Sequence, residues 1–307
     1  MKSGYVSIIG RPNVGKSTLF NSLMNIKLAA VSPKPQTTRA KISGIITSSD
    51  TQIVLWDCPG LFQPKDDFNK KLVKIAVKSI KEIDLILWLI DATSSQHKED
   101  KFVFSSIKKY AISSKHKSPT IFLLINKIDK IKKEDLLPII DSYRKLYDFN
   151  EIIPISALKG ININIVKNKI EEYLPTGQQY FPDDVFTDTS QDIILSEFIR
   201  EKIFLYTKKE IPFSTGVIIN ETCFDEEKNL LYIQADILVN KQSAKKIVIG
   251  YKGQMIKKIG TSARFDMETF LKLQMKKNMK VFIDLFVKVK ENWKENEAII
   301  SSMGLIQ

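Results

Sequence analysis

The first half of the chain alternates short apolar runs with amphipathic stretches. Strands that alternate with helices over residues 4 to 173 predict a mostly parallel sheet covered by helices. One pair of runs differs, because KISGIITS and the next run are joined only by Ser49 and Asp50 and must form a hairpin, so one edge strand is antiparallel. The other strand-like runs are YVSIIG from Tyr5, QIVLWD from Gln52, DLILWLID from Asp84, PTIFLLINK from Pro119 and EIIPISA from Glu151.

This periodicity stops between Leu174 and Gln191, where prolines, a glycine and acidic residues predict a linker. After the linker the pattern predicts a helix near 192–208, strands near 215–222 and 230–239, helices from about 242 and over 254–272, a strand near 279–290 and a short closing helix. This order is typical of an α+β domain of a different plan. We therefore expect an α/β domain in residues 1–174, a linker in 175–190 and an α+β domain in 191–307.

Composition agrees with two domains in one chain. A length of 307 residues with 43% hydrophobic residues can fill two cores. Cys58 and Cys223 match no disulfide or metal spacing, which predicts free thiols in the cytoplasm. No apolar run reaches about 18 residues, and no signal-peptide pattern is present, so we expect neither export nor a membrane span.

The formal net charge of +12 comes mostly from lysine. Lysine suits point contacts with phosphates and gives little bidentate recognition of bases. A lysine-rich proteome would produce the same total, so the position of the charges has to decide between nucleic-acid binding and a merely solvated surface.

The stretch GRPNVGKS, from Gly10 to Ser17, follows the first apolar run and precedes a helical pattern. It has the form G-x-x-x-x-G-K-S, in which the glycines let backbone N–H groups face phosphates and the helix N-terminus adds partial positive charge. We expect Lys16 to reach the β and γ phosphates and the Ser17 hydroxyl to bind Mg²⁺. The rest of the expected phosphate-binding set comprises Gly10, Asn13, Val14, Gly15 and Thr18.

Two later motifs favour GTP over ATP as the bound nucleotide. NKID, from Asn126 to Asp129, follows a buried strand, and the Asp129 carboxylate can accept from two guanine N–H donors that adenine lacks. Asn126 and Lys127 belong to the same expected site. The SAL motif follows the strand EIIPI, where the superfamily offers a backbone N–H to the guanine oxygen, and consists of Ser156, Ala157 and Leu158.

The stretch DCPG, from Asp57 to Gly60, lies at another strand end. Asp57 is expected to hold Mg²⁺ through water, and Gly60 to turn its N–H onto the γ-phosphate. A second switch is expected in SPKPQTTRAK, with Thr38 as the Mg²⁺ and γ-phosphate ligand and Thr37 as the alternative. Leu61 stands where signalling GTPases carry a glutamine, which predicts slow unaided hydrolysis, no faster than roughly 10⁻³ s⁻¹ by analogy with unassisted GTPases. The expected catalytic set is Lys16, Thr38, Gly60 and Asn13.

The second domain has polarised charge. Residues 241–290 contain 13 Lys or Arg against three Asp or Glu, while residues 181–240 contain five against 12. Within the basic part, G-x-x-G between two helical segments in the order α-β-β-α-α-β predicts an RNA-binding KH module, in which the loop clamps the backbone. The alternative is a plain helix–turn–helix corner. The expected RNA contacts are Gly250, Tyr251, Lys252, Gly253, Lys257, Lys258 and Arg264.

The three basic residues after this loop could also be a solvated helix face. The apolar residues beside them are expected to be mostly core, with some lining a groove for bases: Ile247, Ile249, Met255, Ile256 and Ile259. If about six phosphates are neutralised, log affinity for a single strand should fall with log salt with a slope of about −4.

With GRPNVGKS, PQTTR, DCPG, NKID, SAL and IGYKG in one chain, the sequence resembles the Era family of bacterial GTPases over essentially its whole length. The resemblance implies a Ras-like domain joined to a type II KH domain, and a role in small (30S) ribosomal subunit maturation through the 3′ end of 16S rRNA. It also implies peripheral membrane association. In related GTPases with the same P-N-x-G-K sequence the asparagine helps to bind K⁺, which implies that role for Asn13. The alternative is that Asn13 only tightens the loop. Cys58 departs from the common DTPG pattern without touching the expected roles of Asp57 and Gly60.

A GTP-dependent switch that controls RNA binding is our leading hypothesis. An RNA chaperone in which nucleotide only stabilises the fold is an alternative, and so is a membrane GTPase with a basic lipid patch. The protein is expected in the cytoplasm, with peripheral contact at the inner face of the cell membrane implied by the resemblance. A monomer is the default expectation.

Overall fold

The structure is a computed structural model of the 307-residue chain, and it describes all residues except 82, 95–97, 113–118, 276–277 and 306–307. The chain divides into two compact units. The first unit comprises Met1–Asn25 and Lys41–Asp188, and the second comprises Ile26–Ala40 and Thr189–Gln307. A short N-terminal segment therefore packs with the C-terminal part of the chain.

The first unit is built on a six-stranded sheet with the order β2-β3-β1-β4-β5-β6. Its one antiparallel pair among the described strands is β2 with β3, and the other neighbours are parallel. This confirms the predicted mostly parallel sheet with an antiparallel edge strand. The strands are β1 (Lys2–Ile9), β2 (Ile42–Thr47), β3 (Thr51–Asp57), β4 (Leu85–Asp91), β5 (Thr120–Asn126) and β6 (Glu151–Pro154).

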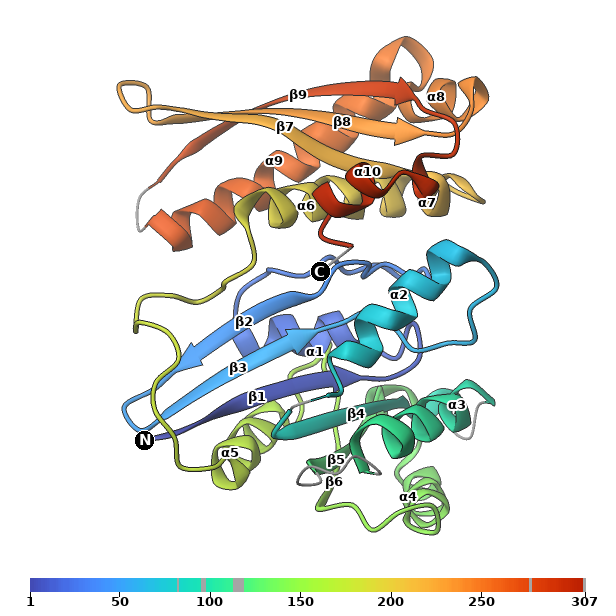
Figure 1. The fold of residues 1–307 in the computed structure, drawn as a ribbon, viewed down its shortest axis with the longest axis vertical. Helices are drawn as coiled ribbons and strands as arrows, with labels where there is room; N and C mark the ends of the chain where they lie inside the picture. The colour runs from blue at the N-terminus through green and yellow to red at the C-terminus, as the bar shows by residue number, and fades with distance from the viewer. Residues whose placement is uncertain (82, 95–97, 113–118, 276–277, 306–307) are drawn as a thin grey trace. The chain divides into compact units, whose positions relative to one another are not determined.

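Helices cover both faces of this sheet, which explains why its central strands are apolar without alternation. All seven residues of β4 are buried. One face packs in a core with Trp88 at its centre and side chains from α2, α3 and α4, while α1 and α5 contact each other elsewhere on the unit (Figure 1). The helices are α1 (Lys16–Met24), α2 (Asp67–Lys78), α3 (Lys98–Ile107), α4 (Leu136–Arg144) and α5 (Ile163–Tyr173).

The second unit has a three-stranded sheet in the order β7-β8-β9, in which β7 and β8 are antiparallel and β8 and β9 are parallel. The parallel pair is joined through α8 and α9, so the order of the long elements is α-β-β-α-α-β, as expected for a KH module. The elements are α6 (Gln191–Tyr206), α7 (Ile211–Ser214), β7 (Gly216–Asp225), β8 (Leu230–Val239), α8 (Gln242–Ile249), α9 (Gln254–Met275), β9 (Lys280–Val289) and α10 (Glu297–Ser302).

Residues 175–188, predicted as most of the linker, pack against the first unit through hydrogen bonds. The Ile45 N–H donates to the Phe186 carbonyl at 2.8 Å, and the Gln52 side-chain amide donates to the Phe181 carbonyl at 2.8 Å. Among the described residues, no helix is both long enough and apolar enough to cross a membrane.

Candidate nucleotide site and nucleic-acid groove

The loop between β1 and α1 is shaped by two glycines. Gly15 has φ of 101°, and a Cβ at this position would lie 2.4 Å from the Asn126 side-chain nitrogen. A Cβ on Gly10 would lie 2.4 Å from the carbonyl oxygen of Leu89 on the neighbouring strand β4. Both positions therefore exclude any side chain, and the loop stays tight at the start of α1, where free backbone N–H groups suit an anion.

Lys16 is the first residue of α1, and it is buried. Its Nζ donates to the carbonyl oxygen of Arg11 at 3.0 Å. Burial lowers the pKa of Lys16 to about 8, against the opposing effect of the Asp57 carboxylate. A phosphate bound to the Lys16 ammonium would replace the neutral Arg11 carbonyl with a charged hydrogen-bond acceptor.

Asn126 joins two of the expected guanine-site loops to the phosphate loop. Its Nδ2 donates to the Val14 carbonyl at 2.7 Å, and its Oδ1 accepts from the Ala157 N–H at 2.9 Å. Both ends of one buried amide are thus used to fix three segments that are far apart in sequence.

Lys127 adds a further link between the guanine-site loop and the phosphate loop, and Ser156 contacts Asp129. Lys127 Nζ donates to the Asn13 carbonyl at 2.7 Å and to Asp91 Oδ2 at 2.6 Å. The Ser156 hydroxyl donates to Asp129 Oδ1 at 2.6 Å, which orients that carboxylate. Asp129 is exposed, as a residue that binds a base must be. Leu158 of the SAL motif is 71% exposed.

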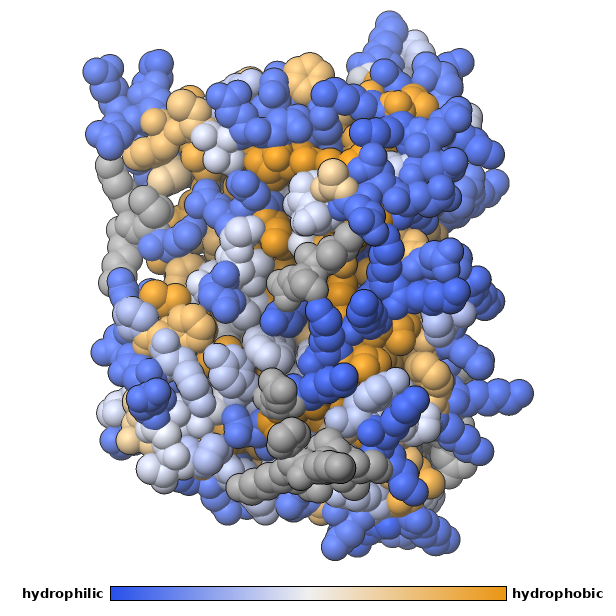
Figure 2. Space-filling model, viewed as in Figure 1, coloured by the Kyte–Doolittle hydropathy of each residue, from blue (hydrophilic) through white to orange (hydrophobic). Residues whose placement is uncertain are grey.

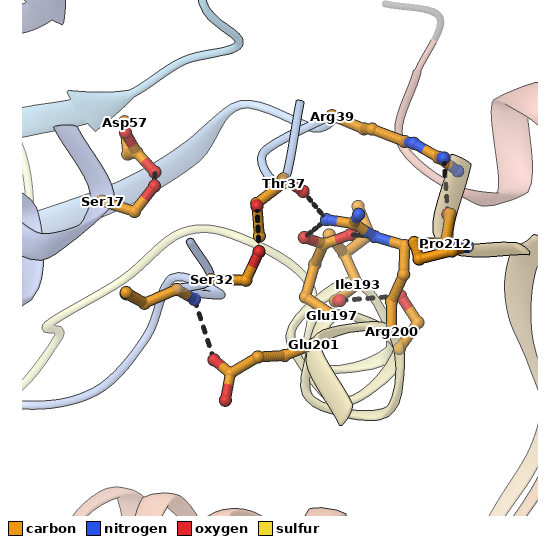
Figure 3. A network of polar contacts seen from close by, with 12 residues as sticks. Ser17, Ser32, Thr37, Arg39, Asp57, Ile193, Glu197, Arg200, Glu201 and Pro212 are labelled. Atoms are coloured by element: carbon orange, nitrogen blue, oxygen red, sulfur yellow. Dashed lines mark hydrogen bonds and ion pairs between the residues drawn. The ribbon is translucent and has the colours of Figure 1, made fainter. Parts of the chain in front are cut away.

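Ser17 and Asp57 meet at the ends of α1 and β3. The Ser17 hydroxyl donates to Asp57 Oδ2 at 2.6 Å (Figure 3). A hydroxyl oxygen beside a fully buried carboxylate is a donor set that fits Mg²⁺, which prefers hard oxygen ligands and retains waters.

The DCPG loop packs directly on the phosphate loop. The Leu61 N–H donates to the Gly10 carbonyl at 3.0 Å, and a Cβ on Gly60 would lie 2.7 Å from the Pro12 nitrogen. Leu61 is completely buried, so its side chain cannot orient a water for attack. In the part of the chain that is described, Asn13, Lys16, Ser17, Asp57, Gly60, Asn126, Asp129 and Ser156 all belong to the first unit.

The expected switch residues Thr37 and Thr38 belong to the second unit. Arg200 of α6 donates to the Thr37 carbonyl, and its Nε donates to Glu197 Oε1 at 2.6 Å (Figure 3). The Thr37 hydroxyl donates to the Lys34 carbonyl at 2.8 Å. The structure thus groups Ser17 and Asp57 in one unit and Thr38 in the other.

Further buried polar contacts hold the same segment. Glu201 Oε2 accepts from the Val31 N–H at 2.8 Å, and Lys27 Nζ pairs with Glu201 Oε1 at 2.7 Å. Arg39 Nη1 donates to the Thr215 carbonyl at 2.6 Å. Sequence reasoning missed these partners, because nothing in the local pattern of residues 26–40 points to α6 or α7.

A second missed arginine supports the phosphate loop. Arg11 Nε lies 3.4 Å from Asp100 Oδ1 on α3, with both side chains at most 10% exposed. Arg11 also donates to the Ser94 hydroxyl. Its position between the two glycines of the P-loop motif was the only available signal.

The G-x-x-G loop has the backbone that its glycines predict. Gly250 and Gly253 have φ of 73° and 77°, and a Cβ on Gly250 would lie 2.6 Å from the Met255 Cβ. Tyr251 is 74% exposed, and Lys252 between the glycines is exposed as well. In Figure 2, hydrophilic side chains gather over the neighbouring α8.

A groove of about 280 Å³ lies between α9 and β9. Lys257 and Arg264 line it from the helix and Phe282 from the strand, whereas Lys258 lies over the Tyr206 ring at 4.2 Å. The expectation that the apolar residues beside the loop are mostly core is wrong. Ile259 is fully buried and Ile256 lines the groove, but Ile247 is 48% exposed, and Ile249 and Met255 are half-buried. The wall supplied by β9 was not predicted from the sequence. Phe282 and Phe286 are four positions apart in a strand pattern, and only the structure shows that both are exposed.

Comparison with known proteins agrees with both units. A family model described as a 50S ribosome-binding GTPase matches residues 5–127, and a KH domain model matches residues 210–294. The chain is 43% identical over 303 residues to GTPase Era of Syntrophus aciditrophicus, covering 99% of this chain and 95% of the relative. It is 44% identical over 304 residues to GTPase Era of Trichlorobacter lovleyi, covering 99% and 97%.

Two solved structures match over 100% of both chains at 38% identity. One is a variant of Aquifex aeolicus Era bound to GDP and AlF4⁻, with a TM-score of 0.91. The other is Era in complex with MgGDPNP and nucleotides 1506–1542 of 16S ribosomal RNA, with a TM-score of 0.90. By its sequence, its two units and the geometry of its nucleotide loops, this chain belongs to the Era family of GTPases.

Proposed function

We propose that this GTPase binds the 3′ end of 16S rRNA during assembly of the small ribosomal subunit, and that its GTP state controls RNA binding. Nucleotide binding is assigned to residues 1–174 and RNA binding to residues 191–307, with 175–190 as the linker. The observation that carries the nucleotide part is the bonding of three loops to one another through Asn126. The relative solved with nucleotides 1506–1542 supports the choice of RNA.

We assign the nucleotide contacts as follows. The backbone N–H groups of the loop from Gly10 to Thr18, apart from Pro12, which has none, surround the phosphates. Lys16 exchanges the Arg11 carbonyl for the β and γ phosphates. Asp129 accepts from guanine while Ser156 fixes its orientation, and the Ala157 backbone beside Asn126 approaches the guanine oxygen.

Ser17 and Asp57 would hold Mg²⁺, Ser17 directly and Asp57 through water. The ion supplies positive charge to the β and γ phosphate oxygens. Because Leu61 is buried and apolar, the water must be oriented by backbone groups around Gly60 and Thr38 rather than by a side chain at that position. This predicts slow hydrolysis without an activator.

Asn13 is assigned to a K⁺ site that adds charge between the phosphates. Its backbone has φ of 67°, and its carbonyl is held by Lys127. Replacing K⁺ by Na⁺ at equal ionic strength should slow turnover, and equal rates in the two salts would remove K⁺ from the mechanism.

The proposed control by GTP rests on the position of residues 26–40. Thr38 has to join the Mg²⁺ and γ-phosphate ligands of the first unit, yet its segment is bonded to α6 and α7 of the second unit through Arg200, Glu201 and Arg39. Any rearrangement of Thr38 therefore acts on the unit that carries the G-x-x-G loop. By linkage, GTP and RNA then favour the same form of the protein.

The RNA contacts are assigned to the G-x-x-G loop, Lys257 and Arg264, which line or adjoin the groove. Lys258 remains a weaker assignment because its ammonium already lies over Tyr206.

The test is GTP turnover in K⁺ buffer with an RNA that copies the 3′ end of 16S rRNA, beside an unrelated RNA of equal length. We expect stimulation by the first RNA alone, and loss of that stimulation in Lys252→Gln. Lys145→Gln, at an exposed lysine of the first unit, is the matched control and should retain it. Tight RNA binding with no stimulation would favour the RNA chaperone instead.

Membrane contact and a monomeric state complete the proposal. Flotation with anionic vesicles tests the first, and light scattering of the nucleotide-bound protein tests the second.

A further inference from the structure

The second unit has another hollow beyond the groove at the G-x-x-G loop. It has a volume of about 370 Å³ and lies where the later part of α9 faces the start of β9. Three lysines line it, Lys228, Lys272 and Lys280, together with Phe265 and Glu268. None of the predicted RNA contacts lines this hollow.

The hollow continues the groove along the same two elements. On α9, positions 257, 261, 264, 268 and 272 follow a helical repeat of three and four, so they share one face. On β9, Lys280 and Phe282 are two residues apart and also share a face. The Val281 N–H donates to Glu268 Oε1 at 3.2 Å and ties the two elements together between the hollows.

The chemistry of this surface suits a single strand of nucleic acid. Phe265 is 70% exposed, and Phe282 is 52% exposed while it stacks on the ring of Tyr232. Exposed aromatic rings beside lysines offer stacking platforms for bases and charges for phosphates. Glu268, the carboxylate among the described lining residues, is already engaged by the Val281 N–H and lies 3.9 Å from Arg264, so it opposes an anionic strand less than a free carboxylate would.

The length of the surface exceeds what the loop alone can hold. A G-x-x-G loop clamps about four nucleotides. Lys257 and Lys272 are separated by about 22 Å along α9 at about 1.5 Å per residue. A strand that enters at the loop and follows α9 therefore reaches the second hollow only with nucleotides beyond those four.

We propose that the hollow lined by Phe265, Lys228, Lys272 and Lys280 is a second RNA subsite, which takes further nucleotides of the strand held by the G-x-x-G loop. The subsite rests on the RNA binding proposed above. Phe265 stacks on a base, and Lys272 and Lys280 neutralise backbone phosphates. Lys228 is paired with Asp225 at 2.9 Å and contributes less charge. An anionic lipid surface would use the lysines but would have no need of an exposed ring next to a continuous groove.

The test compares two RNAs that share one end, of about 5 and about 12 nucleotides, on the full-length protein with a non-hydrolysable GTP analogue. Phe265→Ala should weaken binding of the longer RNA about 5- to 100-fold and leave the shorter one unchanged. Phe224→Ala is the matched control, because Phe224 is 38% exposed on β7, at the opposite edge of the same sheet. It should change neither affinity.

Salt dependence gives a second readout. Lys272→Gln should reduce the slope of log affinity against log salt by about 0.7 for the longer RNA only. Equal effects of the variants on both RNAs, or no effect on either, would overturn the subsite. Loss of binding to anionic vesicles with unchanged RNA affinity would assign the hollow to lipid. Failure of the unaltered protein to bind either RNA would instead overturn the proposed function.

Discussion

The Asp129 carboxylate accepts one hydrogen bond from Ser156, although the residue is exposed to solvent. Ser156 donates to one carboxylate oxygen, so the group is oriented before a base arrives. This residue could be found from sequence because NKID is a short local motif at a strand end, and the same holds for the P-loop glycines. The supporting role of Arg11 could not be predicted from the sequence, because its partner Asp100 lies on α3 and only the folded chain brings the two residues together.

Asp129→Asn should weaken GTP binding about 10²- to 10⁴-fold, because two charge-assisted hydrogen bonds to guanine are lost. The new amide can donate to the extra carbonyl of xanthine, so xanthosine triphosphate should bind the variant better than GTP. Competition titrations with the two nucleotides measure this. Unchanged preference for GTP would remove Asp129 from base recognition.

The two cysteines should differ in reactivity. Cys58 is fully buried, and this burial raises the pKa of its thiol to about 11, whereas Cys223 is exposed. Since the thiolate is the reactive form, a disulfide reagent at about pH 8 should modify Cys223 rapidly and Cys58 only after denaturation. Cys223→Ser is the control and should abolish the fast reaction, and a persistent fast phase would contradict the burial of Cys58.

At the scale of elements, local patterns were sufficient for every long helix and strand of the second unit. The strand predicted over 230–239 is β8, and the one predicted near 279–290 is β9. The groove wall on β9 escaped prediction because alternation in VFIDLFVKV identifies a strand without saying which helix faces it. The contacts of residues 26–40 with α6 could not be predicted for the same reason, since Arg200 and Thr37 are 163 positions apart.

Arg200→Gln should lower the free energy of unfolding by about 3 kcal/mol, because it leaves Glu197 buried without its ion-pair partner. Thermal or urea unfolding measures the change. Lys70→Gln removes an ion pair whose side chains are 68% and 88% exposed, and it should leave the transition unchanged. Equal stability of the two variants would mean that the Arg200 contacts do not hold the segment.

At the scale of the whole molecule, the predicted fold class is confirmed, and the proposed coupling of GTP to RNA has a thermodynamic test. If the GTP-analogue form binds RNA more tightly than the GDP form by some factor, about 5- to 150-fold being typical of allosteric proteins, RNA must raise the preference for the analogue over GDP by the same factor. Calorimetry on the four legs of the cycle measures both factors. A factor of one on both sides would show that nucleotide and RNA bind independently.

The membership of residues 26–40 in the second unit has a consequence for experiments on isolated domains. The chain crosses between the units three times, after residues 25, 40 and 188. A fragment that ends at residue 188 keeps the switch segment but loses Arg200, Glu201 and Thr215, so the contacts that hold its backbone in the full protein are gone. A fragment that begins at residue 189 has the opposite defect, because buried Arg200 and Glu201 lose the segment of residues 26–40 that they contact. The rates and affinities of either half therefore describe a molecule with a different switch from that of the intact protein.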